Sequence, residues 1–283
     1  MQKILVPTDF SKNATKAITY ASEVAQKTGA TIYLMHSIEI SINMATMQSD
    51  SSNPKVVKER SEMLKLSIDS VNAIYPGVKV ITHLSGGGPV ESILDFSEKE
   101  KMDLIIMGTT GASGLKKIFM GSVASGTIAK TTIPVLTIPA AYDVEEPDAI
   151  LFATNHFEKN KNILNRIINL SSIFSTSIHV VVFKETDREK YADLIYNEEQ
   201  LNDYLQFLKE SFPTVDFKAG LLEGNDFEMS IEEYSNEHGI DIIALVTYPK
   251  SFLERILQKS VTKQMAFHST TPLLAIPANC SED

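Results

Sequence analysis

The sequence predicts an α/β fold made of two tandem domains, each with an open parallel sheet. Two observations predict it. Short apolar runs of strand length alternate with longer amphipathic segments, which is the pattern of parallel strands joined by helices. The chain also repeats itself, since residues 131–140 (TTIPVLTIPA) reappear almost unchanged as residues 269–278 (STTPLLAIPA). With 283 residues, the chain is long enough for two cores of ordinary size.

The first elements can be assigned in order along the chain. The apolar run 4–7 predicts a strand. A helix follows, because the small apolar residues within 14–25 recur at helical spacing on one face. Residues 31–35 predict the second strand. A polar stretch, 48–55, reads as a loop, and the amphipathic segment 57–74 predicts a helix.

The remaining elements of the first half follow the same alternation. Residues 78–82 predict a third strand, and 89–99 a helix with a proline in its first turn, where no backbone donor is needed. Residues 104–107 predict the fourth strand. A glycine-rich loop then leads to a helix over 122–129 and a last strand over 134–138.

The second half repeats this order. The offset between the halves is 146 residues at the start and 138 further on, and we assign the eight-residue difference to the polar stretch 48–55, where a loop tolerates insertion. An acidic, proline-bearing linker spans 142–148. We therefore expect domains over 1–141 and 149–279, packed as an internal pseudo-dimer through antiparallel pairing of their last strands.

Composition excludes several classes of partner. The chain is 43% hydrophobic and 22% charged, as globular proteins are, and its net charge of −10 argues against nucleic acid or an anionic membrane as the main partner. Its one cysteine, Cys280, cannot form an internal disulfide, which favours a reducing compartment. The sequence shows neither an apolar leader nor a stretch of membrane-spanning length. These features predict a cytoplasmic protein.

One glycine pattern carries the strongest functional signal. Gly108, Gly111 and Gly121 follow the fourth strand in the arrangement G-x2-G-x9-G-S, and Ser122 opens a helix. Glycines let the backbone approach an anion, and the unpaired N–H groups at a helix start point at it. In open α/β sheets, ligands bind beyond the carboxyl ends of the strands, where this loop lies. The pattern therefore predicts a phosphate site.

With this motif, the chain resembles a tandem universal stress protein over nearly all its length. Members that bind ATP carry G-x2-G-x9-G-[ST] after the fourth strand. Further matches are residues 6–11 (VPTDFS), 34–38 (LMHSI), 87–89 (GGP) and 134–136 (PVL). The resemblance implies Rossmann-like domains of the adenine nucleotide alpha-hydrolase type.

The resemblance also implies an ATP site in the first domain. The residues that match the family's ligand positions are Pro7, Thr8 and Asp9 near the adenosine, Ser37 and Ile38 at the adenine, and Gly108, Gly111, Gly121, Ser122 and the Val123 amide at the ribose and phosphates. ADP or AMP are alternative ligands, and a magnesium ion on the phosphates is compatible with the site. Asp9 also fits a helix N-cap, so both roles stay open.

The second domain has lost the motif. The offset of 138 places Val246, Pro249 and Lys259 where the first half has Gly108, Gly111 and Gly121. Side chains at these positions obstruct a phosphate, and proline removes a donor. We therefore expect one nucleotide per chain. Asp241 matches Asp103 although the motif is gone, which favours a structural role for both residues.

These observations favour an ATP-binding, nucleotide-responsive stress or signalling factor with a protein partner. No arrangement of Ser, His, Cys or carboxylates indicates catalysis, so any ATPase activity should be slow, and the spacing of the six histidines predicts no metal site. The alternative is an adaptor that acts by dimerisation and partner binding without nucleotide. An ATP-using transferase has less support, because no motif marks a second substrate site. A homodimer of the whole chain is compatible with each reading.

Overall fold

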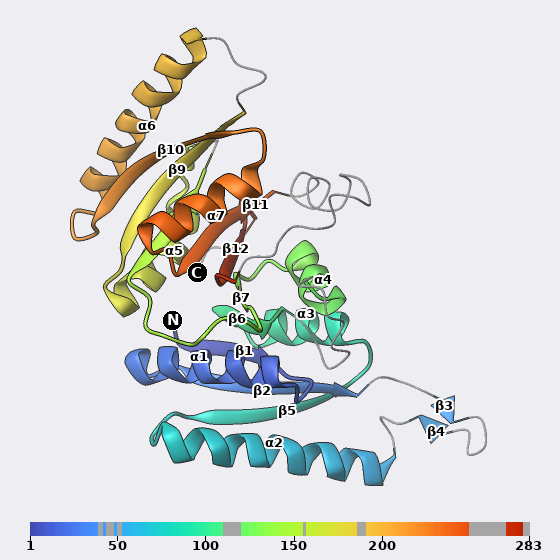
Figure 1. Cartoon of the computed structure of the whole chain (residues 1–283). Helices are drawn as coiled ribbons and strands as arrows, with labels where there is room; N and C mark the ends of the chain where they lie inside the picture. Colours follow the sequence, from blue (N-terminus) through green and yellow to red (C-terminus); the bar gives the residue numbers. More distant parts are fainter. Residues whose placement is uncertain are drawn as a thin grey trace. The chain divides into compact units, whose positions relative to one another are not determined.

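The computed structural model describes residues 1–38, 42–43, 48–49, 53–109, 120–154, 157–185, 191–248 and 270–279. The chain divides into two compact units, Met1–Val144 and Glu145–Asp283. Both are α/β units in which helices connect the strands of a parallel sheet, as Figure 1 shows. Within the described residues, no helix is long and apolar enough to cross a bilayer.

Unit 1, Met1–Val144, has a five-stranded parallel core. Its elements are β1 (Lys3–Pro7), α1 (Lys12–Thr28), β2 (Thr31–Ile38), β3 (Ile42–Asn43), β4 (Gln48–Ser49), α2 (Pro54–Ile74), β5 (Val80–Gly86), α3 (Pro89–Lys99), β6 (Leu104–Gly108), α4 (Ser122–Lys130) and β7 (Val135–Ile138). The strand order is β5-β2-β1-β6-β7, with all neighbours parallel. The predicted fold class and alternation are confirmed.

The helices of unit 1 form two pairs. Helix α1 contacts α2, and α3 contacts α4. Because crossovers between parallel strands are right-handed, the reversal of strand order puts the two pairs on opposite faces of the sheet. The chain runs from β1 to one edge and returns through β6 to the other. The crevice between the carboxyl ends of β1 and β6 is therefore the topological switch point.

Unit 2, Glu145–Asp283, repeats this architecture. Its elements are β8 (Ala149–Ala153), α5 (Lys161–Phe174), β9 (Ser177–Glu185), α6 (Tyr191–Ser211), β10 (Phe217–Gly224), α7 (Phe227–His238), β11 (Ile242–Thr247) and β12 (Leu273–Pro277). The strand order β10-β9-β8-β11-β12 is that of unit 1, again with parallel neighbours. The packing of the two units as a pseudo-dimer stays a prediction.

Some local features differ from the sequence-based expectations. The third strand begins at Val80 rather than Val78, because the Val78 amide donates to Tyr75 in a turn (3.2 Å). The short antiparallel pair β3–β4 lies in and beside the stretch expected to be a loop. The length difference between the halves falls between β2 and α2, where the sequence places it, since α2 and α6 are both 21 residues long.

Asp103 and Asp241 have the structural role that their repetition predicts. The Asp103 carboxylate accepts hydrogen bonds from the backbone amides of Gln2 (2.5 Å) and Lys3 (2.9 Å). In unit 2, Asp241 accepts from the amides of Asp148 (2.7 Å) and Ala149 (3.1 Å). Asp103 thus connects the start of β6 to the start of β1, and Asp241 connects the start of β11 to the start of β8.

Candidate functional site

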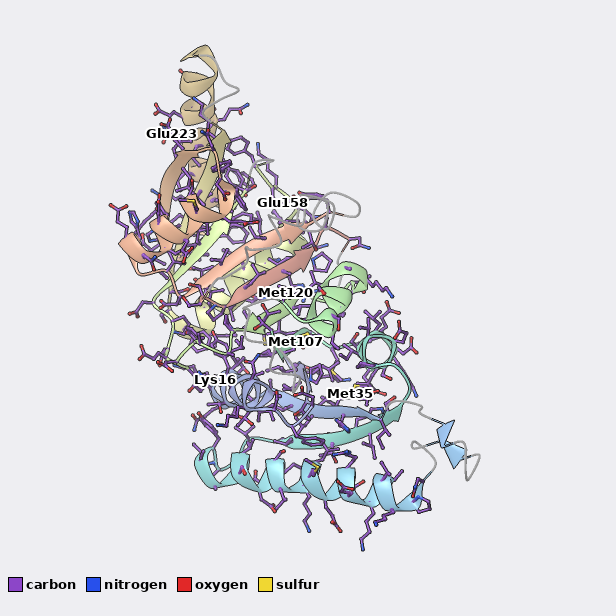
Figure 2. The ribbon with its side chains drawn as sticks, turned by 45° about the vertical axis from the view of Figure 1, so that its right-hand side comes forward. Lys16, Met35, Met107, Met120, Glu158 and Glu223 are labelled. Atoms are coloured by element: carbon purple, nitrogen blue, oxygen red, sulfur yellow. The ribbon has the colours of Figure 1, made fainter. Side chains whose placement is uncertain are left out.

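The residues implied by the resemblance gather around the switch point of unit 1. Ile4 pairs with Leu104 and Leu5 with Ile105. Thr8 and Gly108, four residues after Ile4 and Leu104, therefore lie side by side at the carboxyl ends of β1 and β6. Ser37 and Ile38 end the neighbouring strand β2, which pairs with β1. Figure 2 labels Met35 on β2, Met107 on β6 and Met120 just before α4. Residues from the ends of β1, β2 and β6 and from the start of α4 thus lie at the carboxyl ends of the strands.

The segment after β1 is held by its own hydrogen bonds. The Thr8 amide donates to the Met35 carbonyl (2.8 Å), and the Asp9 carboxylate accepts from the Ser11 amide (3.0 Å). Ser11, rather than Asp9, is the N-cap of α1, because its hydroxyl accepts from the Ala14 amide (3.1 Å). The helix-cap reading of Asp9 is therefore wrong, and its exposed carboxylate lies beside the switch point.

His36 is a residue of this region that the sequence did not single out as a ligand. Its Nδ1 lies 2.8 Å from the Thr8 carbonyl oxygen, so Nδ1 carries the proton and donates it. Burial lowers the His36 pKa, a shift that nearby Arg60 reinforces and that the Thr8 carbonyl and Asp9 oppose. The Phe10 ring lies against the imidazole at 4.5 Å, and Phe10 adopts a positive φ of 65°. A neutral imidazole therefore fixes the backbone that precedes Asp9.

Ser37 and Ile38 have different surroundings. Ile38 is buried, and its carbonyl accepts from the Gly87 amide (2.9 Å). The Ser37 hydroxyl donates to the Gly87 carbonyl (2.7 Å) and lies 3.3 Å from the Ser92 hydroxyl. Ser37 therefore ties the end of β2 to the start of α3 and anchors one wall of the candidate site.

The glycine-rich segment begins and ends at one point. The Gly121 amide donates to the Thr109 carbonyl (2.5 Å), which closes the segment where β6 ends and α4 begins. Gly121 is the N-cap of α4 and supplies no side-chain cap, while Ser122 is exposed and Val123 half-buried in the first turn. The first-turn amides of α4 therefore receive no capping side chain from Gly121, which suits an anion. Gly111 lies outside the described residues.

Gly108 has a packing role that the sequence did not suggest. A Cβ atom at this position would lie 2.7 Å from Nδ2 of Asn13, in the first turn of α1. Asn13 is buried. The first glycine of the motif thus lets α1 approach β6 closely, whatever else it does for a ligand.

The corresponding region of unit 2 is built differently. The Glu158 carboxylate, after β8, accepts a hydrogen bond from the Tyr248 hydroxyl, after β11 (2.8 Å), and another from the Asn160 amide (2.7 Å). The Tyr204 hydroxyl donates to the Glu158 carbonyl. Burial and the Glu158 carboxylate raise the pKa of Tyr248 to about 12. A protein carboxylate therefore links the two strands that flank the switch point of unit 2.

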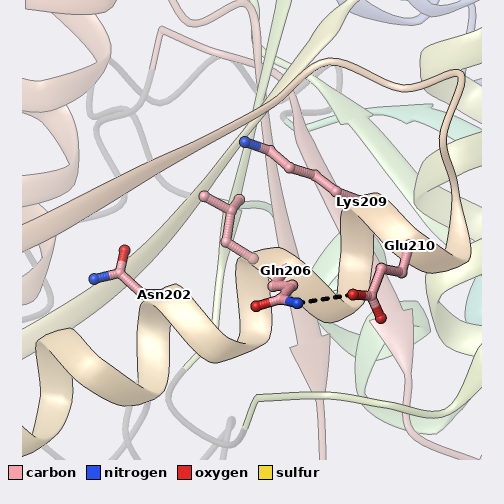
Figure 3. A pocket seen from close by; sticks show the side chains of 5 residues that line it. Asn202, Gln206, Lys209 and Glu210 are labelled. Atoms are coloured by element: carbon pink, nitrogen blue, oxygen red, sulfur yellow. Dashed lines mark hydrogen bonds between the residues drawn. The ribbon is translucent and has the colours of Figure 1, made fainter.

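A hollow of about 360 Å³ lies on the surface of α6 (Figure 3). All its lining residues belong to that helix, namely Asn202, Leu205, Gln206, Lys209 and Glu210. The Gln206 amide donates to the Glu210 carboxylate across it (2.8 Å). None of its lining residues comes from the strand ends at the switch point of unit 2. Among the described residues, no three His, Cys, Asp or Glu side chains gather as a metal site.

The comparisons with known proteins agree with this geometry. The universal stress protein family model matches residues 1–139. A universal stress protein of Methanocaldococcus jannaschii is 32% identical over 139 residues, which cover 48% of this chain and 81% of that protein. The strand order and these matches define the chain as a doubly wound α/β protein of this kind. The chain belongs to the universal stress protein family, and its two similar halves make it a tandem type.

Two solved structures extend the comparison. A universal stress protein from Archaeoglobus fulgidus covers 97% of this chain and 96% of its own, with a TM-score of 0.68 at 20% identity, so the fold of the whole chain is shared. A universal stress protein in complex with cAMP covers 48% of this chain and 96% of its own, with a TM-score of 0.40 at 21% identity.

Proposed function

We propose that unit 1 binds one adenine nucleotide, ATP first among them, and that the chain acts as a nucleotide-responsive stress or signalling factor. One observation carries the proposal. Asp9, Ser37, Gly108 and Gly121 are far apart in sequence but lie together at the carboxyl ends of β1, β2 and β6 and at the start of α4, around the switch point.

The chemistry of this edge suits a nucleotide. The first turn of α4, in which the N-cap Gly121 has no capping side chain, would supply donors for phosphate oxygens through Ser122 and the Val123 amide, and magnesium would be carried by the phosphates. We infer that Asp9 would accept from a ribose or base and that Pro7, Thr8, Ser37 and Ile38 would lie close to the adenosine. Gly111 belongs to the proposed site by its place in the motif.

We assign no nucleotide to unit 2. Glu158 and Tyr248 connect its strand ends, and a carboxylate at that point repels a phosphate. The degenerate motif in this unit agrees with that assignment, although Pro249 and Lys259 lie outside the described residues. The domain limits 1–141 and 149–279, cytoplasmic localisation and a homodimer remain parts of the proposal.

The direct test is to identify and count the nucleotide released by acid from freshly purified protein. We expect about one adenine nucleotide per chain. Gly121→Val should abolish this binding while the fold persists, because a branched side chain at the N-cap of α4 obstructs a phosphate. Ala129→Val, which adds bulk at an exposed position near the other end of α4, serves as the control. Unchanged affinity in Gly121→Val would refute the site.

The second candidate function is an adaptor that uses both units for assembly and binds no nucleotide. It has a specific observation in its favour, since the switch point of unit 2 is bridged by its own side chains and the unit is retained. Two results would favour it: no nucleotide on the purified chain, and no binding when ATP is added back.

A further inference from the structure

We propose that Gly108 is a positioning residue for α1. Because glycine has no side chain, the first turn of α1 can pack closely against β6, and this helical turn holds Asp9 at the site. The link from this contact to nucleotide binding rests on the proposed function. The packing itself does not depend on any ligand.

The distances at Gly108 leave no room for a side chain. A Cβ there would lie 2.7 Å from Nδ2, 2.9 Å from Cγ and 3.2 Å from the backbone carbonyl carbon of Asn13. Only 6% of the Asn13 surface is exposed, so its amide cannot swing into solvent. Gly108 is not among the glycines with positive φ, so its backbone conformation is open to other residues. The close approach of α1, and not backbone conformation, requires glycine.

Unit 2 shows what accompanies a side chain at this position. Gly108 pairs with Ile138 and Val246 with Ile276, so Val246 occupies the place of Gly108. Helices α1 and α5 end at matching residues, each closed by a left-handed residue, Gly29 and Ser175.

The two helices nevertheless begin at different positions. Helix α1 starts at Lys12, and the matching residue of unit 2 is Glu158, yet α5 starts only at Lys161. The missing turn is the one that carries Asn13 in unit 1. At the position of Asn13, unit 2 has the exposed Lys159.

The missing helical turn changes which side chains lie at the carboxyl ends of the strands. In unit 1, the turn begins at the Ser11 N-cap, whose amide donates to Asp9 and holds that carboxylate beside the switch point. In unit 2, Glu158 lies outside the helix and accepts from Tyr248 instead. Gly108 therefore acts on the site through α1: glycine permits the turn, and the turn positions Asp9.

The test is a double-mutant cycle of Gly108→Ala and Asn13→Ala in the full chain. Thermal unfolding of the ligand-free protein and hydrogen exchange in the first turn of α1 measure the packing, and a fluorescent ATP analogue measures binding. Gly108→Ala should lower the Tm by about 2–6 °C, speed exchange at Ala14 and Thr15, and weaken binding about tenfold. Asn13→Ala should restore most of each loss, because it removes the two shortest contacts.

Val246→Ala is the matched control at the equivalent strand end and should not change binding. The inference is overturned if Gly108→Ala leaves the Tm and first-turn exchange of the ligand-free chain unchanged, or if Asn13→Ala rescues neither. If the wild-type chain does not bind the analogue, the proposed function fails. The unfolding and exchange data would then still decide whether Gly108 admits the turn.

Discussion

At the scale of single residues, several polar side chains of this protein act through partners that are distant in sequence. Asp103 could be assigned a structural role because Asp241 repeats it without the glycine motif. His36 and Asn13 gave no such signal. Their partners, the Thr8 carbonyl and Gly108, are brought to them only by strand pairing and helix packing. Periodicity marks such residues as buried or exposed but does not name what they touch.

A buried histidine of unit 2 gives a prediction about pH. His179 is 3% exposed, and its Nδ1 lies 3.0 Å from the Tyr234 hydroxyl. Burial lowers the His179 pKa, Lys218 and His238 lower it further, and Asp216 opposes them. The unfolded chain therefore binds a proton more readily, so His179 should cost unit 2 stability as the pH falls through 6.5.

The measurement is the Tm of wild type and His179→Gln between about pH 7.5 and 5. Wild type should lose more stability on acidification than the variant, even if the variant is less stable at pH 7.5. Asn236→Gln, which changes an exposed residue of α7 that does not titrate, serves as the control. Parallel pH profiles for wild type and His179→Gln would contradict the prediction.

At the scale of elements, the apolar pattern and the turn residues between segments made most helix and strand boundaries predictable. Strands β1, β6 and β7 of unit 1 are near-continuous apolar runs, and the alanine-rich face expected over 14–25 is the buried face of α1. The start of α5 has both a local and a distant cause. Asn160 caps the helix where it begins, because its side chain accepts from the Asn162 amide, and Glu158 just before it is bonded to Tyr204 and Tyr248. Only the first of these could be expected from the local sequence. The short β3–β4 pair likewise lacks the apolar alternation that marks a strand.

The bridge at the switch point of unit 2 gives a prediction at this scale. Tyr248→Phe removes the hydroxyl that donates to Glu158 and should lower the free energy of unfolding of unit 2 by about 1 kcal/mol, measured by urea unfolding. Tyr75→Phe is the matched control. The Tyr75 hydroxyl donates to Glu23 over 3.3 Å, so a smaller effect is expected. Equal effects would mean that the bridge adds nothing particular to unit 2.

At the scale of the whole molecule, the two units share a fold but differ in charge. Unit 1 has fourteen Lys and Arg against thirteen Asp and Glu, whereas unit 2 has twelve against twenty-three. The overall net charge of −10 therefore belongs almost entirely to unit 2. Since a nucleoside triphosphate is itself an anion, the field of unit 2 opposes its approach and that of unit 1 does not. Charge and the Glu158–Tyr248 bridge thus favour the same unit for the nucleotide.

This asymmetry predicts where ATP should protect the chain from hydrogen exchange. A ligand that binds only the folded state adds about 2.7 kcal/mol of stability at a hundred times its Kd. We expect slower exchange at the ends of β1, β2 and β6 and in the first turn of α4. Exchange at the equivalent ends of β8 and β11 should stay unchanged. Gly121→Val should remove the protection in unit 1, which would show that it comes from the site. Equal protection at both switch points would contradict a single nucleotide per chain and would mean that the Glu158–Tyr248 bridge opens to admit a ligand.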